Sequence, residues 1–179
     1  MDLRVETRLD AEGRSTSRLI HGAGSLPCAI GRGGLRLAQD KREGDGATPI
    51  GRWPLRRLLF RPDRLAPPGT ALPSAAISPD DGWCDDPADP HYNRPVSLPF
   101  AGSHERLWRS DGLYDLVVVL GHNDDPPEPG LGSAIFLHCA SAGFAPTAGC
   151  VAVARDALLQ LLPDLAPGDH IRVCPADSR

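Results

Sequence analysis

Hydrophobic and polar residues alternate in short stretches along the chain, a pattern typical of β-strands. Residues 3–9 read LRVETRL, and Ser15–Ile20 follows after the turn-like Asp10–Gly13. Alternation on both sides of a polar turn predicts a β-hairpin. Short apolar stretches at Pro27–Ile30 and Leu35–Ala38, separated by a glycine-rich turn, continue the pattern.

Aliphatic runs in the second half of the chain predict buried strands, because β-branched and aliphatic residues suit a strand that is covered on both faces. Two runs are DLVVVL at Asp115–Leu120 and AIFLH at Ala134–His138, and a third begins at Cys150–Val153. We expect a short helix over Asp156–Leu162, closed by the next proline, and a last strand over His170–Val173. The chain is therefore predicted to be mainly β or α+β, with one or two short helices.

Two segments interrupt these runs. Asp40–Ile50 is a polar, glycine-punctuated loop, whereas residues 61–99 hold much of the proline and few periodic signals, which predicts a long irregular surface segment. Loops of such length in compact domains are usually functional or mobile. Within the second segment, Trp83–Pro87 and Tyr92–Arg94 suit either a cleft wall or loop packing. No repeat or low-complexity linker divides the chain, so we expect one domain over residues 1–179.

The composition argues against nucleic-acid and membrane partners. Of the 179 residues, 41% are apolar and 23% are charged, which excludes a disordered chain. The formal net charge is −4, without the clustered lysine and arginine of a nucleic-acid site. No stretch approaches the ~20 apolar residues of a membrane span. One loose arginine group suits a solvated face or a local anion site; it consists of Arg52, Arg56, Arg57, Arg61 and Arg64.

The sequence context of the cysteines distinguishes Cys150 from the others. There are five cysteines and no CxxC pair, which favours free thiols and leaves a single disulfide open. Cys28, Cys84 and Cys174 are predicted to be core residues, as an isolated cysteine usually is. Cys150 differs because it follows Thr147, Ala148 and Gly149 at the start of a strand.

The segment that ends at Cys150 carries the candidate chemistry. His138 ends one predicted strand and Cys150 opens the next, so that two adjacent strand ends can bring imidazole and thiol together. A free thiol of pKa about 8.5 is only a few per cent thiolate at pH 7, and a neighbouring base makes it a usable nucleophile. Gly149 allows close approach to the backbone, where successive N–H groups can bind an oxyanion.

These motifs resemble those of the YkuD family of L,D-transpeptidases. The pattern of His138, a loop, Thr147-Ala148-Gly149-Cys150 and an apolar strand is similar to the active-site signature of that family. Lys41–Gly51 (KREGDGATPIG) resembles a second family landmark, and Gly121-His122-Asn123 precedes the strand that leads to His138. The resemblance is strongest over residues 20–175, and it implies a YkuD-like mixed β-sandwich or open barrel.

The resemblance implies roles for individual residues. Cys150 would be the nucleophile, His138 the general base, and the N–H groups of Gly149 and Cys150 the oxyanion donors. The carbonyl of Cys139 would orient the imidazole. Expected substrate contacts come from Thr147, His122, Asn123, Ala152 and Tyr92, although His122 suits a structural hydrogen bond equally well. Within the Lys41–Gly51 loop, the acidic residues are expected to tie turns together. We expect neither a cofactor nor a metal.

The sequence departs from the family pattern at two points. The loop between His138 and Thr147 is short, which reduces any lid over the site. The family commonly has arginine two residues after the cysteine, where this chain has Ala152. Because some members that form 1,3-links also have a small residue there, we expect either 3,3- or 1,3-cross-links.

The expected substrates are peptidoglycan stem peptides, and carbapenem-type compounds are expected inhibitors. With water as acceptor, the same site would make an L,D-carboxypeptidase. This substrate places the protein in the periplasm or cell wall, whereas the charged segment Met1–Asp10 shows no export signal and leaves a cytoplasmic location open.

Two other site types compete with this interpretation. A papain- or NlpC-like peptidase would place its cysteine before its histidine, opposite to the order here. A zinc-binding module could use His122, His138, Cys139 and Cys150, but zinc sites favour close-spaced ligand pairs.

Overall fold

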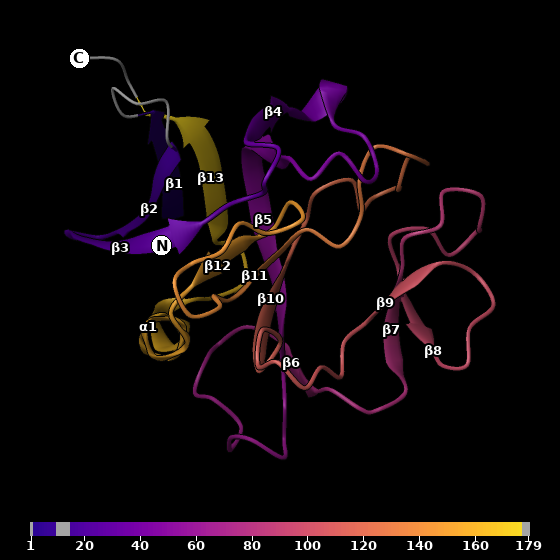
Figure 1. Cartoon of the computed structure of the whole chain (residues 1–179). Coiled ribbons are helices and arrows are strands. Elements are labelled where there is room, and N and C mark those ends of the chain that lie inside the picture. Colours follow the sequence, from indigo (N-terminus) through magenta and orange to yellow (C-terminus); the bar gives the residue numbers. More distant parts are fainter. Residues whose placement is uncertain (1, 10–14, 177–179) are drawn as a thin grey trace.

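The computed structural model describes residues 2–9 and 15–176 (Figure 1). Strands predominate, as expected for a mainly β fold. The strands are β1 (Asp2–Leu9), β2 (Ser15–His21), β3 (Gly24–Ala29), β4 (Leu35–Leu37), β5 (Thr48–Phe60), β6 (Ser74–Ala76), β7 (Asp81–Cys84), β8 (Pro95–Ser97), β9 (His104–Arg106), β10 (Leu116–Leu120), β11 (Phe136–Cys139), β12 (Val151–Val153) and β13 (His170–Pro175). The helical elements are α1 (Arg155–Leu161) and two 3₁₀ turns, η1 (Ala38–Asp40) and η2 (Leu162–Asp164).

The main sheet closes on itself into a barrel-like ring. Its strand order is β10-β11-β12-β3-β2-β1-β13-β5-β4, and β10 also pairs with β5. The pairing of β10 with β5 joins two distant parts of this order. Most neighbours are antiparallel, but four pairs are parallel, so the sheet is mixed: β1 with β13, β11 with β12, β4 with β5 and β5 with β6. The expected mixed β architecture is confirmed.

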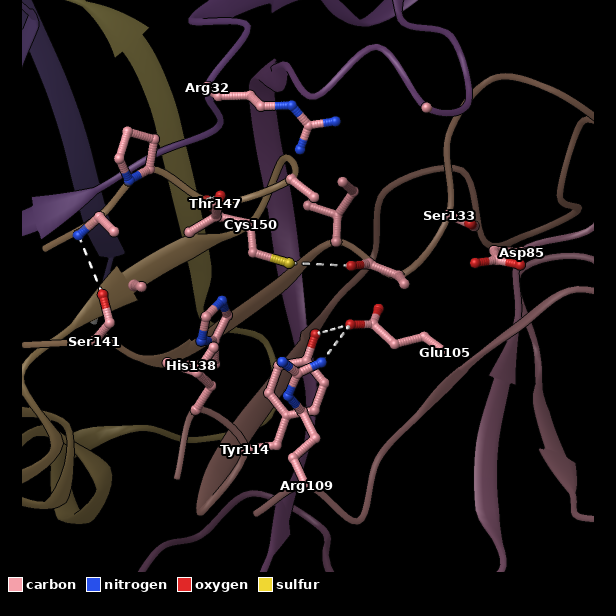
Figure 2. Close-up of a pocket in the computed structure, with 18 of the residues that line it drawn as sticks. Arg32, Asp85, Glu105, Arg109, Tyr114, Ser133, His138, Ser141, Thr147 and Cys150 are labelled. Carbon is pink, nitrogen blue, oxygen red and sulfur yellow. Dashed lines mark hydrogen bonds and ion pairs between the residues drawn. The ribbon is translucent and has the colours of Figure 1, made fainter. Parts of the chain in front are cut away.

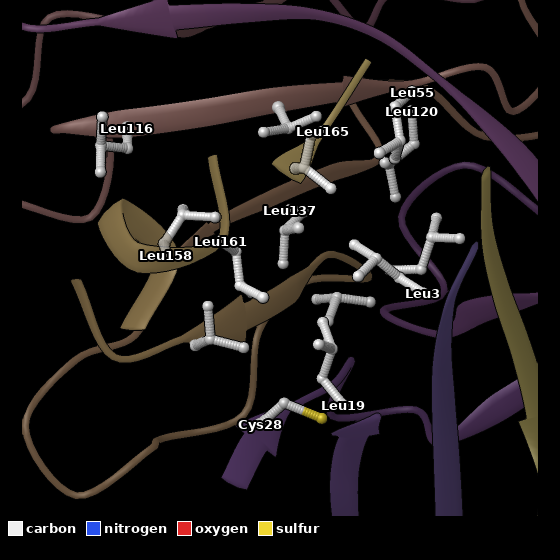
Figure 3. Close-up of a cluster of buried hydrophobic side chains, with 14 of the residues drawn as sticks. Leu3, Leu19, Cys28, Leu55, Leu116, Leu120, Leu137, Leu158, Leu161 and Leu165 are labelled. Carbon is white, nitrogen blue, oxygen red and sulfur yellow. The ribbon is translucent and has the colours of Figure 1, made fainter. Parts of the chain in front are cut away.

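A main core fills the ring, and every strand of the ring contributes to it (Figure 3). Strand alternation explains how: on β10, Leu116, Val118 and Leu120 point into this core. Helix α1 adds Leu158 and Leu161, both buried. Full burial of a leucine side chain contributes roughly 2 kcal/mol relative to exposure, so this core supplies much of the stability.

The opposite faces of the same strands build a second, smaller cluster, which we call the cavity-side cluster. Its members are Ile77, Trp83, Leu107, Tyr114, Val117, Val119, Ala134, Phe136 and Cys150. Several of them come from the small sheet β8-β7-β9 and its flanking loops, which stand beside β10 in Figure 1. Trp83 of β7 meets the ring of Phe136 edge-on at 5.2 Å between centroids. This contact holds the small sheet against β11.

The hairpin predicted for the start of the chain is confirmed, since β1 and β2 pair antiparallel from Arg4↔Ile20 to Leu9↔Ser15. The predicted turn Asp10–Gly13 lies outside the described residues. Strands β10 to β13 and helix α1 also match the aliphatic runs, with ends shifted by a residue or two.

Residues 48–99 differ from the expectation. Strand β5 spans thirteen residues, although its sequence TPIGRWPLRRLLF contains two prolines and three arginines. The segment 61–99, expected to be irregular, contains β6, β7 and β8. Neighbouring strands impose these conformations, which the local sequence does not favour.

The loose arginine group forms no common anion site. Arg52 bonds to Asp2, Arg56 to Asp124, Arg61 to Asp63 and Arg64 to Asp115, so that four of its five members have separate acidic partners. In the described part of the chain, none of the helices is long and apolar enough to cross a membrane.

Candidate active site

The candidate residues lie around a cavity of about 650 Å³ (Figure 2). The ends of β11 and β12 form one wall of it, and the 141–148 loop and the turn at Arg32 form the rim. Residues from the segment 85–114 form the opposite wall. Cys150, His138, Thr147 and Ala152 all line this cavity.

Strand register places His138 and Cys150 on the same face. Strands β11 and β12 are parallel, and His138 pairs with Ala152. Since alternate residues of a strand share a face, Phe136 and His138 face the same side as Cys150 and Ala152. The intervening Leu137 and Val151 point into the main core. The fold thus brings a thiol and an imidazole to one cavity although eleven residues separate them in sequence.

The imidazole of His138 is buried and fixed by a backbone carbonyl. Its Nδ1 lies 2.8 Å from the carbonyl oxygen of Cys139. A carbonyl only accepts hydrogen bonds, so Nδ1 carries the proton and Nε2 of the neutral ring is left as the acceptor. Burial lowers the pKa of His138 to about 4. At neutral pH the ring is therefore uncharged and able to take a proton.

The Cys150 thiol is also uncharged at neutral pH. Burial raises the pKa of Cys150 to about 12. The thiol donates a hydrogen bond to the carbonyl of Ala134 at 3.1 Å and accepts one from the N–H of Phe136 at 3.4 Å. Figure 2 shows the sulfur directed at that carbonyl rather than at His138. The pair is a neutral thiol beside a neutral imidazole, not a preformed thiolate–imidazolium ion pair.

Ala134 reaches the thiol through an unusual backbone conformation. Its φ is 51°, a region that non-glycine residues seldom occupy. The N–H of Ala134 is held at 3.0 Å by the side-chain oxygen of Asn93, which also accepts a hydrogen bond from Trp83 Nε1 at 2.9 Å. Asn93 is 4% exposed, so a buried amide fixes the backbone on the N-terminal side of Ala134, whose carbonyl contacts Cys150.

The turn before Cys150 is held by the Thr147 hydroxyl. This hydroxyl donates to the carbonyl of Cys150 at 2.7 Å and accepts from the N–H of Gly149 at 3.1 Å. Gly149 has φ 139°, and a Cβ there would lie 2.9 Å from the carbonyl oxygen of Ala47. Only glycine fits this position, because both the conformation and the space exclude a side chain. Of the two N–H groups expected to bind an oxyanion, that of Gly149 is thus bonded to Thr147 in this structure.

Cys139 lies beside His138 but points the other way. Its side chain belongs to the main core, with the thiol 3.9 Å from the carbonyl oxygen of Leu116. Only its backbone carbonyl contacts the candidate site. Of the cysteines expected in the core, Cys28 and Cys84 are buried, whereas Cys174 is partly exposed. None of the described cysteines forms a disulfide.

The Lys41–Ala47 loop is bound tightly to its surroundings, as expected for its acidic residues. Asp45 accepts hydrogen bonds from Lys41 Nζ at 2.6 Å and from the N–H of Ala47 at 2.8 Å. Glu43 accepts from the hydroxyl groups of Tyr92 and Ser133 at 2.5 and 2.7 Å. Glu43 therefore ties this loop to the two segments that carry Tyr92 and Ser133.

Three predicted substrate contacts lie away from the cavity. His122 is 4% exposed, and its Nε2 lies 3.0 Å from the carbonyl oxygen of Leu131. Asn123 is bonded through its side chain to Glu128 and Gly132 of the same loop. The Tyr92 hydroxyl donates a hydrogen bond to Glu43 and accepts one from the N–H of Gly132. These three side chains do not line the cavity and instead hold the neighbouring loops together, so their role in substrate binding stays a prediction.

Sequence reasoning missed a polar group on the opposite wall. Glu105 of β9, Arg109 and Tyr114 all line the cavity. The Tyr114 hydroxyl donates to Glu105, and its ring meets that of His138 edge-on at 5.2 Å. Burial raises the pKa values of both Glu105 and Tyr114. No motif in the segment 105–114 marked these residues, because folding rather than sequence spacing brings them to His138.

The alternative zinc site is not assembled. The four expected ligands point in different directions: His122 lies behind the wall, Cys139 in the main core, and His138 and Cys150 in the cavity. Among the described residues, no cluster of three or more His, Cys, Asp and Glu side chains could hold a metal ion.

Comparison with known proteins agrees with this geometry. The family model of the YkuD L,D-transpeptidase catalytic domain matches residues 13–173, nearly the whole chain. Searches of the curated proteins and of the solved structures returned no match. Because the family model covers both strand ends that carry His138 and Cys150, as well as the Lys41–Gly51 loop, the chain belongs to the YkuD family of L,D-transpeptidases.

Proposed function

We propose that this protein is a cysteine-dependent L,D-transpeptidase that joins peptidoglycan stem peptides through an acyl-enzyme on Cys150. The family is one of enzymes that act on peptidoglycan. The observation that carries the proposal is the placement of Cys150 and His138 on one face, with Nδ1 of His138 held by the Cys139 carbonyl at 2.8 Å. That arrangement leaves Nε2 free to act as a base.

The reaction begins with transfer of the thiol proton. The Cys150 side chain turns from the Ala134 carbonyl towards His138, and Nε2 removes its proton as the sulfur attacks a substrate carbonyl. Both groups are neutral beforehand, so the proton moves during attack, as in general-base catalysis. The tetrahedral intermediate then expels the amine of the next residue, which takes the proton from His138, and leaves a thioester on Cys150.

The second half of the reaction transfers the acyl group. An amine of a second stem peptide attacks the thioester, and His138 accepts a proton from that amine and returns it to the departing thiol. A new amide bond forms and Cys150 is regenerated. With water in place of the amine, the same steps give an L,D-carboxypeptidase.

Oxyanion stabilisation requires backbone N–H groups near the attacked carbonyl. The N–H groups of Gly149 and Cys150 are our candidates. Since the Gly149 N–H is bonded to Thr147 Oγ1 at 3.1 Å, it must exchange that acceptor for the oxyanion when substrate binds. Thr147 is thus both a cavity-lining residue and the group that holds this donor in the resting site.

The substrate chemistry places the enzyme at the periplasm or cell wall, where stem peptides are joined. The cross-links are either 3,3 or 1,3, because Ala152 leaves a small, 1% exposed side chain at a position that can otherwise carry arginine.

Incubation with purified muropeptides followed by mass spectrometry tests the proposal. Cross-linked dimers support it, and tandem mass spectrometry assigns the bond as 3,3 or 1,3. Shortened monomers without dimers would indicate the carboxypeptidase instead. Absence of any product from the intact protein, with Cys150 in the free thiol form, would overturn both.

A carbapenem provides an independent test, because a β-lactam carbonyl is an activated acyl donor for a thiol beside an oxyanion site. We expect a single adduct in the intact mass, mapping to Cys150. An adduct on Cys84 or Cys174, or none after prolonged incubation, would count against Cys150 as the nucleophile.

A further inference from the structure

Most charged side chains that line the cavity are held by protein partners. Glu43 is bonded to Tyr92 and Ser133, Glu105 to Tyr114, and Arg109 to Asp111 at 2.5 Å. Arg32 differs from them. No carboxylate or carbonyl within the described ranges lies within hydrogen-bonding distance of its guanidinium, although it lines the same cavity. An unpartnered guanidinium at a cavity rim is free to bind a ligand.

The backbone holds Arg32 close to the nucleophile. Its N–H donates to the carbonyl of Thr147 at 2.9 Å, three residues before Cys150. The preceding Gly31 is in close contact with both the 44–47 turn and Gly149, since a Cβ at Gly31 would lie 2.1 Å from the Gly46 carbonyl oxygen. Arg32 therefore keeps a fixed position relative to the turn that carries Cys150.

The position of the Arg32 side chain is also defined by the surrounding backbone. A Cβ on Gly46 would lie 3.0 Å from Cγ and 3.2 Å from Cζ of Arg32, so the side chain lies across the bare backbone of Gly46. Figure 2 shows the guanidinium extending over the cavity on the side of Cys150 opposite His138. The absence of a side chain at Gly46 is what lets Arg32 reach this position.

The other charged residues of the cavity favour binding of an anionic group at Arg32 rather than elsewhere in the cavity. Glu43, Asp85 and Glu105 are lining residues from other segments, and one carboxylate oxygen of Asp85 is buried without a hydrogen-bond partner. An anionic group entering the cavity is repelled by these acids and attracted by Arg32. A planar guanidinium binds a carboxylate through two parallel hydrogen bonds, which fixes orientation as well as position.

We propose that Arg32 binds a carboxylate of the peptide substrate and thereby sets which way the peptide lies across Cys150. This inference rests on the proposed function, because it assigns part of the same cavity to that substrate. Arg32 determines specificity and takes no part in the proton transfers, so its loss raises KM and leaves kcat nearly unchanged.

Binding measured without turnover tests this inference. Two stem tetrapeptides of the same sequence are used, one with all carboxylates free and one with all converted to carboxamides, and calorimetry measures their binding to the Cys150→Ala protein. We expect the free acid to bind about five- to tenfold more tightly, as a partly exposed charge-assisted contact should allow. Adding Arg32→Gln should abolish this preference, and Arg32→Lys should keep part of it.

Arg36→Gln in the same background is the matched control. Arg36 is an exposed arginine four residues away that pairs with Asp45 at 3.5 Å and does not line the cavity. It should leave the preference unchanged. Equal binding of acid and amide by the Cys150→Ala protein, no binding of either, or a preference that survives Arg32→Gln in folded protein would each overturn the role of Arg32. Turnover of muropeptides by the intact protein is measured separately, so the failure of one proposal is distinguishable from failure of the other.

Discussion

The two faces of strands β11 and β12 have different roles. On one face, Leu137, Cys139, Val151 and Val153 fill the main core. On the other, His138, Cys150 and Ala152 line a cavity. Cys139 and Cys150 make the contrast sharpest, because both are buried thiols whose pKa values burial raises, to about 11 and about 12. Their chemistry differs through the direction in which each points, not through burial or pKa.

This comparison shows how one short stretch of chain can serve stability and chemistry together. Period-two alternation lets every second residue be chosen for packing and the others for the site. Substitutions on the two faces should therefore fail in different ways, one by loss of folding free energy and the other by loss of turnover.

The largest effect is expected for Cys150→Ala. Removal of a covalent nucleophile should lower turnover of muropeptides by at least about 10³-fold. Thermal unfolding should change little, because the Cys150 thiol contacts the cavity wall rather than the main core. Turnover within tenfold of the parent would contradict our assignment of the nucleophile.

A smaller but still large effect is expected for His138→Gln. Glutamine can still donate a hydrogen bond to the Cys139 carbonyl, but it cannot take the thiol proton. Loss of a general base should reduce kcat by about 10²- to 10⁴-fold with little change in KM. A variant that retains most of its kcat would show that another group removes the proton.

The third prediction concerns pH and follows from the buried imidazole. Because the folded pKa of His138 is about 4 and its unfolded value is ordinary, the unfolded state binds the proton first as pH falls. The free energy of unfolding should therefore drop from pH 6.5 towards pH 4, by up to about 3 kcal/mol from this residue.

Urea denaturation at several pH values measures this loss. In the His138→Gln variant, the free energy of unfolding should depend less steeply on pH, because the contribution of His138 is absent. His122 gives a slope of the same sign, since burial also lowers its pKa. The same shift predicts that kcat/KM holds its plateau down to about pH 5, instead of falling near pH 6.5. An acidic limb near pH 6.5 would be inconsistent with the buried, neutral imidazole.

The smallest effect is expected for Cys139→Ala. The variant keeps the carbonyl that orients His138 and loses only a core thiol, so the free energy of unfolding should fall by about 1 kcal/mol. Turnover should stay within about twofold of the parent. A loss of turnover comparable to that of Cys150→Ala would refute the division between the two faces.

The fold was predictable where the sequence reports burial directly. Strand β10 consists entirely of aliphatic residues, and all five are buried. Strand β5 escaped prediction because its arginines and prolines break any simple alternation. Pro54 lacks an N–H, yet its carbonyl still accepts a hydrogen bond from Gly121 at 2.9 Å, so the pairing survives where local propensity argues against it.

The candidate site was predictable only where its residues are close in sequence. His138, Thr147, Gly149 and Cys150 lie around one loop, and the structure brings their strand ends to one cavity. Glu105 and Arg32 reach it from distant segments, so no local motif marks them. His122, Asn123 and Tyr92 have polar side chains of the right kind, but hydrogen bonds within the supporting loops use them instead.

The parallel pairing of β1 with β13 has a consequence for how the protein is made. Six residue pairs, from Asp2↔His170 to Thr7↔Pro175, join the first and the last strands of the described chain. Leu3 and Val5 are fully buried beside Ile171 and Val173. During synthesis on the ribosome, β1 therefore cannot form its hydrogen bonds to β13 until β13 has been synthesised and has left the ribosome. Until then the unpaired backbone groups of β1 and the side chains of Leu3 and Val5 stay accessible to other nascent chains, so a chaperone that shields them early should raise the yield of folded protein.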